Sequence, residues 1–232
     1  MKLSRFNHAS LDSQLGNSVC EAEDTEETFW LRRLDDYQSR LSLGNALARQ
    51  YRFKEAVIAY EKARLIRSDD AMLYICLGGA NLTLFRFDEA KKNYETALSL
   101  NASEKSVFYP LGVWHYLRRE YSVAADYFYN CLPCDDEMKI AVIYWHTLAS
   151  FRGGFDPILL EEYESDMDVG HHAAYKTAVS VFNGECEWDQ TAEVNDELEA
   201  AVIQYGLSVY LEHIGEHKEA ERYAEKTLKN TS

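Results

Sequence analysis

The sequence has few residues that interrupt helices, with only 3 Pro and 11 Gly among 232 residues. It also lacks an apolar run of about 18 residues, which is the length that a membrane-spanning helix needs. No apolar segment typical of a secretory signal precedes Cys20, and five cysteines, an odd number, do not suit a framework of paired disulfides. We therefore expect a mostly helical protein of the cytoplasm that does not enter a membrane.

Positive charge is scarce in the second half of the chain. Residues 1–134 contain 17 Lys and Arg against 18 Asp and Glu, a net charge of −1, whereas residues 135–232 contain 7 against 21, a net charge of −14. A half this acidic repels phosphate backbones, so we expect no binding of nucleic acid. Its acidic surface is either simply solvated or attracts partners that have a basic surface.

The motifs of common enzyme classes are also missing. There is no glycine-rich phosphate loop, no nucleophile elbow and no H-E-x-x-H segment. Cys131 and Cys134 form a C-x-x-C pair, which suits a dithiol switch or half of a zinc site; the alternative is a buried small residue at position 131. His213 and His217 are four residues apart, but Gly215 between them predicts a turn rather than a metal-binding helix face. We expect no catalysis, no cofactor and no metal.

The sequence does contain a repeat with a period of 34 residues. Four registers occur three times each: Gly44, Gly78 and Gly112; Ala56, Ala90 and Ala124; Tyr60, Tyr94 and Phe128; and Ala63, Ala97 and Cys131. A fixed period of this length predicts a solenoid of stacked helical hairpins. The small residues would let two helices cross closely, and the large residues would fill the space between layers.

This pattern resembles the tetratricopeptide repeat. The resemblance implies an all-α, right-handed solenoid of about five helical hairpins, with regular repeats over about 37–70, 71–104 and 105–138. It also implies that the first helix of each repeat, the A helix, lines a concave groove. Such arrays act as binding scaffolds, and nothing in the repeat itself performs chemistry.

Three regions follow along the chain. Residues 1–22 are polar and aperiodic, which predicts a flexible tail. Residues 23–138 hold an N-terminal helix and the three regular repeats. Residues 139–232 hold degenerate hairpins with an acidic surface and a last, capping repeat. Within this region Asp156-Pro157 predicts the start of a helix that continues through Tyr163.

The order of these elements, with Phe182-Asn183-Gly184-Glu185 ahead of a last hairpin, resembles the NlpI-type bacterial lipoproteins. That family consists of repeat adaptors that hold other enzymes together. No apolar stretch precedes Cys20 here, so we expect no lipid anchor.

The register implied by the tetratricopeptide resemblance selects the residues of the groove. The partner-binding positions are Leu41, Asn45, Arg49, Ile75, Gly79, Leu82, Tyr109, Val113 and Tyr116. Met72 and Leu117 fall on the same face. Some tetratricopeptide proteins bind the C-terminal carboxylate of chaperones with a clamp of five polar and basic residues. The corresponding positions here are Leu41, Asn45, Cys76, Ser106 and Pro110. Only Asn45 matches the residue of the clamp, so we expect no binding of this kind.

A stripe this apolar predicts an interaction site, unless the chain's own N-terminal or C-terminal helices fill the groove. Our hypothesis is a non-catalytic scaffold or adaptor that binds an extended or helical segment of a protein or peptide partner. The alternative is a chaperone that shields an apolar segment of a client. Self-association of the array is also open.

Overall fold

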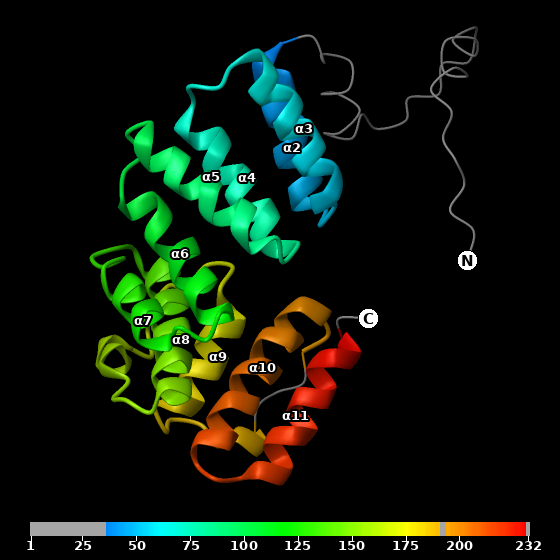
Figure 1. Cartoon of the computed structure of the whole chain (residues 1–232). Helices are drawn as coiled ribbons and strands as arrows, with labels where there is room; N and C mark the ends of the chain where they lie inside the picture. The colour runs from blue at the N-terminus through cyan, green and yellow to red at the C-terminus, as the bar shows by residue number, and fades with distance from the viewer. Residues whose placement is uncertain (1–35, 191–193, 231–232) are drawn as a thin grey trace, which may run out of the picture.

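The computed structural model describes residues 36–190 and 194–230, which form ten α-helices, two 3-10 helices and no strand (Figure 1). The helices of the three regular repeats are α2 (Tyr37–Arg49), α3 (Phe53–Ile66), α4 (Ala71–Thr83), α5 (Phe87–Ser99), α6 (Lys105–Leu117) and α7 (Tyr121–Tyr129). The C-terminal helices are α8 (Asp136–Gly153), α9 (Ala173–Phe182), α10 (Glu197–His213) and α11 (His217–Asn230). The 3-10 helices are η1 (Ile158–Glu162) and η2 (Trp188–Gln190). The predicted all-α repeat architecture is confirmed.

The 34-residue period is visible as a repeated helical hairpin. The A helices α2, α4 and α6 begin at Tyr37, Ala71 and Lys105, so each starts 34 residues after the one before. Each A helix packs antiparallel against its B helix, which is α3, α5 or α7 in turn. The predicted flexible tail, 1–22, and the predicted N-terminal helix both lie outside the described residues.

One glycine and one aromatic ring set the distance between the two helices of each hairpin. A Cβ added to Gly44 or Gly78 would overlap the ring of Tyr60 or Tyr94 on the B helix. At Gly112 the added atom would lie 2.6 Å from the ring of Phe128. Real side chains do not approach this closely. The glycine register and the aromatic register of the repeat therefore describe one contact between the two helices of a hairpin. The alanine registers Ala56, Ala90 and Ala124 are fully buried as expected.

Aspartates cap the helices that start the first two repeats. Asp36 accepts a hydrogen bond from the backbone N–H of Ser39, and Asp70 accepts one from that of Met72. Side-chain caps of this kind satisfy backbone donors that the helix itself leaves unpaired. The Asp70 carboxylate also accepts hydrogen bonds from the Tyr37 hydroxyl at 2.7 Å and from Arg67 at 2.6 Å. The Asp70 side chain therefore connects the start of the second repeat to the beginning of α2 and to the end of α3.

The turn between the A and B helices keeps the same backbone conformation through all three repeats. Tyr51, Phe85 and Arg119 stand 34 residues apart and have φ of 59°, 56° and 64°. This left-handed region is unfavourable for residues that carry a Cβ, and helices usually end there on glycine. In the last hairpin the corresponding turn contains Gly215, with φ of 86°.

The C-terminal half departs from the regular repeat. The helix predicted from Asp156-Pro157 is only the short 3-10 helix η1, and it packs on α8. The helix that completes the fourth hairpin with α8 is instead α9, which begins at Ala173. The Tyr163 backbone returns to an extended conformation, so the helical turn that begins after Pro157 ends there.

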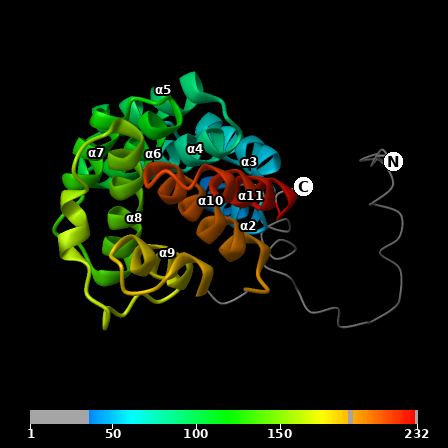
Figure 2. The ribbon, with the colours of Figure 1, turned by 90° about the horizontal axis from the view of Figure 1, so that it is seen from below.

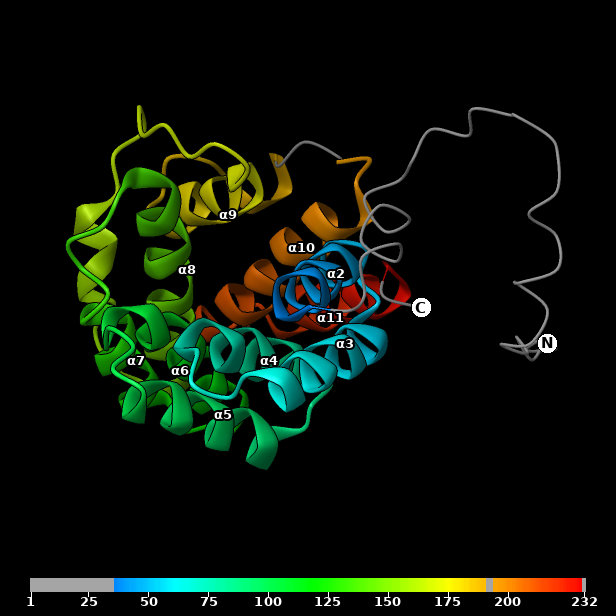
Figure 3. The ribbon, with the colours of Figure 1, turned by 90° about the horizontal axis from the view of Figure 1, so that it is seen from above.

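The chain as a whole follows a curved path. In Figure 3 the B helices α3, α5 and α7 lie on the outer rim, and the A helices α2, α4 and α6 lie inside it. In the projection of Figures 2 and 3, α10 and α11 fall within this curve, and Figure 1 shows that they lie at a different level, below α4 and α5. Among the described residues, no helix combines the length and apolar character required to span a bilayer.

Candidate functional site

The candidate site is the concave face formed by α2, α4 and α6. The predicted groove residues all lie on these three helices. The structure separates them into side chains that the array itself buries and side chains that remain accessible.

In the first repeat, the groove residues are mainly engaged in packing. Leu41 is buried in the same apolar cluster as Leu73 and Leu77. The side-chain carbonyl of Asn45 accepts a hydrogen bond from the Tyr60 hydroxyl at 2.8 Å, and the Cys76 thiol lies 3.6 Å from the same oxygen. Asn45 thus joins both helices of its hairpin to α4. Arg49 is exposed at the end of α2.

In the second repeat, the A helix presents an accessible strip. Leu82 is buried, and Ile75 is half-buried between two core clusters. Met72, by contrast, is 54% exposed. A Cβ added to Gly79 would have no other atom within 4 Å, so the space beside this backbone is open. Met72 and Gly79 are seven residues, or two helical turns, apart and share one face of α4.

In the third repeat, the C-terminal helices cover the predicted groove residues. The Tyr116 ring is buried against Trp145 on α8, and its hydroxyl lies 2.8 Å from that of Tyr205 on α10. Tyr109 and Val113 pack against the same core cluster. The alternative that the chain's own C-terminal helices fill the groove therefore holds at this end of the array.

A hollow of about 330 Å³ remains beside Tyr116. Its walls include Arg119, Arg152 and the two hydrogen-bonded tyrosines. Burial raises the pKa of Tyr116 well above its usual value, and the positive charge of Arg152 offsets part of that rise. In the described part of the chain neither arginine forms an ion pair with a carboxylate. Guanidinium groups and hydroxyls in this arrangement can donate hydrogen bonds to an acidic group.

Sequence reasoning missed Arg152 and Tyr205 as parts of this face. Both come from α8 and α10, where the 34-residue register has degraded. No local signal in the sequence brings them next to Tyr116, because 89 residues separate Tyr205 from Tyr116.

The cysteine and histidine pairs have the two features expected from packing alone, a buried residue at position 131 and a turn between the two histidines. Cys131 is buried, and burial raises the pKa of its thiol to about 12, with a further contribution from Cys134. Such a thiol is mostly protonated at neutral pH, which disfavours nucleophilic or metal-binding chemistry. His213 stacks on Phe151 at the end of α10, whereas His217 pairs with Glu212 at 3.2 Å. No group of three or more His, Cys, Asp or Glu among the described side chains could hold a metal ion.

Comparison with known families finds one match within the first hairpin. Residues 38–68 match the tetratricopeptide repeat. This segment covers most of α2 and all of α3, the hairpin in which Gly44 meets Tyr60. The tetratricopeptide resemblance of the sequence is thus supported, while the resemblance to NlpI-type adaptors is not confirmed.

The chain was also compared with curated proteins and with solved structures. No curated protein matches the chain. Among solved structures, the tetratricopeptide protein YrrB, described as having an unusual peptide-binding site, is similar at 16% identity and a TM-score of 0.49. That match covers 87% of this chain and 91% of YrrB.

Proposed function

We propose that this protein is a non-catalytic scaffold that binds an extended or helical segment of a partner protein along its concave face. The observation that carries the proposal is the accessible strip on α4, where Met72 is exposed and the space beside Gly79 is open. Met adapts its shape to varied apolar side chains, and a glycine lets a second backbone approach closely. Both properties suit the binding of a peptide segment.

The hollow beside Tyr116 supports the direction in which such a segment would run. It is lined by residues of α6, α8 and α10 and of the turn after α6, and α6 contacts α4, so a segment that runs from the strip toward the C-terminal helices would meet it. The guanidinium groups of Arg119 and Arg152 would then meet an acidic group of the segment. The apolar contacts would supply most of the binding free energy, and the charged group would fix the orientation.

The test compares two double variants with the same change in charge. Met72→Glu/Gly79→Glu places two carboxylates on the strip, at an interval of seven residues on α4. Ile58→Glu/Leu65→Glu places two carboxylates at the same interval on α3, where both side chains are exposed. Each purified variant is first shown by circular dichroism to keep its helicity.

Proteins from a native extract that bind to each immobilised form are then identified. We expect partners that the wild type and the α3 variant retain and that the α4 variant loses. Equal retention by all three forms would show that the strip is not the working surface. The chaperone alternative uses the same strip, and it predicts in addition that an aggregation-prone partner becomes soluble when co-expressed with the wild type.

A further inference from the structure

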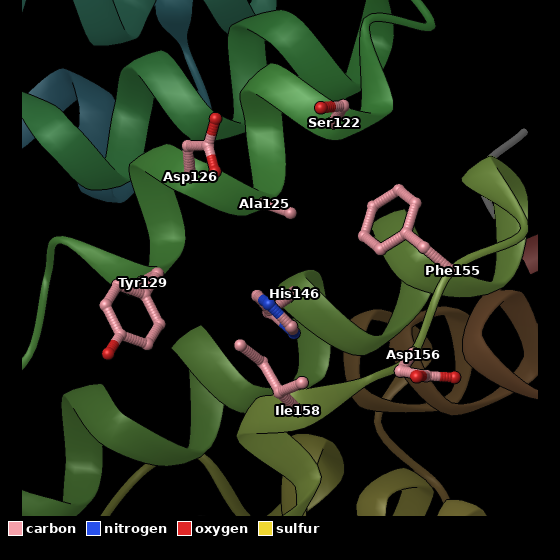
Figure 4. A pocket seen from close by; sticks show the side chains of 8 residues that line it. All are labelled: Ser122, Ala125, Asp126, Tyr129, His146, Phe155, Asp156 and Ile158. Carbon is pink, nitrogen blue, oxygen red and sulfur yellow. The ribbon is translucent and has the colours of Figure 1, made fainter.

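A second hollow, of about 460 Å³, lies away from the concave face. It is formed by α7, α8 and the segment 155–158 that precedes and enters η1 (Figure 4). Because α7 is on the outer rim of the curve, this hollow, which we call the outer cavity, is separate from the groove positions on α2, α4 and α6.

Two carboxylates stand in the wall of the outer cavity. Asp126 comes from α7, and Asp156 comes from the segment after α8. No lysine or arginine lines the outer cavity, and within the described ranges neither carboxylate forms an ion pair. The cavity therefore holds negative charge that the protein itself does not neutralise there.

A buried and unpaired imidazole lies in the same cavity. His146 is 2% exposed, and its Nδ1 atom has no hydrogen-bond partner in the structure. Figure 4 shows the imidazole in the middle of the lining side chains, between Tyr129 and Ile158 on one side and Asp126 and Ala125 on the other. This atom is enclosed, so a ligand does not reach it; a ligand in the cavity would instead form its hydrogen bond with the other ring nitrogen, Nε2.

Burial also controls the charge of this imidazole. It lowers the pKa of His146 to about 4, although the carboxylate of Asp126 opposes the shift. At neutral pH the ring is therefore uncharged and does not repel a cation. A neutral imidazole keeps one ring nitrogen as a hydrogen-bond acceptor.

The remaining lining selects among cations. Tyr129 and Phe155 contribute aromatic rings, and the volume is far larger than a metal ion needs. A guanidinium group is planar, stacks on aromatic rings and donates to several acceptors at once, whereas an ammonium group is a compact, strongly hydrated charge. Acceptors on separate elements, with aromatic rings in the same lining, suit the guanidinium group.

We propose that the outer cavity binds the side chain of an arginine from a partner protein, with Asp126 and Asp156 neutralising its charge and His146 accepting a hydrogen bond. This inference rests on the interaction function proposed above and gives the protein a second contact surface. It also provides a specific place for the basic partner that the acidic half of the sequence suggested.

The test uses three blocked peptides that differ in one side chain. Acetyl-Ala-Ala-Arg-Ala-Ala-amide is titrated into the full chain and followed by changes in its two-dimensional nuclear magnetic resonance spectrum. The peptide with citrulline in place of arginine has the same shape without the charge, and the peptide with lysine has the charge without the planar group. Agmatine tests whether a small guanidino compound is the preferred ligand.

We expect the arginine peptide to bind at least about tenfold more tightly than the citrulline and lysine peptides and more tightly than agmatine. Equal binding of the citrulline or lysine peptide would overturn the assignment to a guanidinium group. Tighter binding of agmatine would overturn the assignment to a partner chain. Absence of binding by every probe would overturn the site itself.

Matched variants locate the binding. Asp126→Asn/Asp156→Asn should weaken the arginine peptide at least about tenfold, because both neutralising charges are lost. Asp166→Asn/Asp189→Asn changes the same number of exposed carboxylates outside the cavity and should change binding less than twofold. Equal weakening by the two variants would show only general attraction to an acidic protein and would overturn the proposal.

A third variant separates binding from folding. His146→Phe removes the unpaired nitrogen but keeps an aromatic ring, so we expect it to unfold at a higher urea concentration and to bind the arginine peptide several-fold more weakly. Unchanged peptide binding in this variant would remove His146 from the site. The concave variant Met72→Glu/Gly79→Glu should bind the peptide like the wild type, so failure of the scaffold proposal and failure of this one give different results.

Discussion

The hydroxyl groups of Tyr116 and Tyr205 lie 2.8 Å apart and join the third repeat to helix α10, across 89 residues of sequence. Burial raises the pKa of both hydroxyls, so both stay protonated and neutral. One hydroxyl donates to the other, and the acceptor keeps its own hydrogen for a ligand or for solvent in the neighbouring hollow. This contact is where the C-terminal helices close one end of the predicted groove.

A double-mutant cycle measures what this contact contributes. We expect Tyr116→Phe and Tyr205→Phe each to lower the free energy of unfolding by about 1 kcal/mol, because each removes the partner of a partly buried hydroxyl. The double variant should lose much less than the sum of the two, since it leaves no orphaned hydroxyl. Urea denaturation followed by circular dichroism gives the three values, and simple additivity would show that the hydroxyls do not interact.

Two adjacent glycines on α4 should respond in opposite directions to the same substitution. In Gly78→Ala the new methyl group overlaps the ring of Tyr94, which is fully buried and cannot move aside, so we expect a loss of roughly 1–3 kcal/mol. In Gly79→Ala the methyl group meets no atom within 4 Å, so we expect a gain of about 0.5–1 kcal/mol from the better helix propensity of alanine.

Thermal and urea unfolding of the two variants test this pair. Each serves as the control for the other, because the residues are neighbours on one helix. Destabilisation by Gly79→Ala equal to that by Gly78→Ala would contradict the open surface on which the proposed function depends.

The turn at Phe85 provides a site for stabilisation. Its φ of 56° is unfavourable for a residue with a Cβ, and its side chain is 69% exposed. Replacing it by glycine should raise the free energy of unfolding by roughly 1 kcal/mol. Phe85→Ala loses the same ring contact with Phe87 but keeps the Cβ, so it should be less stable than Phe85→Gly.

The melting temperatures of these two variants give the comparison directly. A glycine variant no more stable than the alanine variant would mean that the left-handed turn costs nothing in this protein.

His146 should make the protein less stable in acid. Its pKa is lowered to about 4 in the folded state because burial disfavours the charged ring, and the unfolded chain has the ordinary value of 6.5. Between these values the unfolded state binds more protons than the folded state, so the free energy of unfolding falls as the pH decreases from about 6.5 to 4. The full loss is on the order of 3 kcal/mol.

The difference between the wild type and His146→Phe isolates this effect from the titration of carboxylates. Unfolding free energies measured from pH 7 to pH 4 should decrease more steeply for the wild type. Parallel curves for the two proteins would show that His146 is not protonated on unfolding.

The period of 34 residues predicted the first three hairpins almost to the residue. Helices α2, α4 and α6 begin where the predicted repeats begin, because the spacing of small and large residues is itself the packing of one helix on the next. In this part of the chain each element contacts its sequence neighbours, so local pattern and tertiary contact carry the same information.

The sequence was less informative where contacts are distant. The helix predicted after Pro157 is the 3-10 helix η1, and the fourth hairpin is completed by α9. Tyr116 was predicted to face a partner and instead packs on Trp145 and Tyr205. Nothing in the local pattern distinguishes an apolar side chain that awaits a partner from one that a later helix covers.

The sequence by itself determined the repeat and its helices, because these follow from short-range periodicity and side-chain size. Only the tertiary structure decided which parts of the concave face stay accessible and which side chains from separate helices meet. The strip at Met72, the arginines beside Tyr116 and the outer cavity around His146 all depend on the path of the chain after the regular repeats. That path is set by the burial of large aromatic side chains from α8, α9 and α10. The residues that they contact are distant in the sequence and do not follow a periodic pattern.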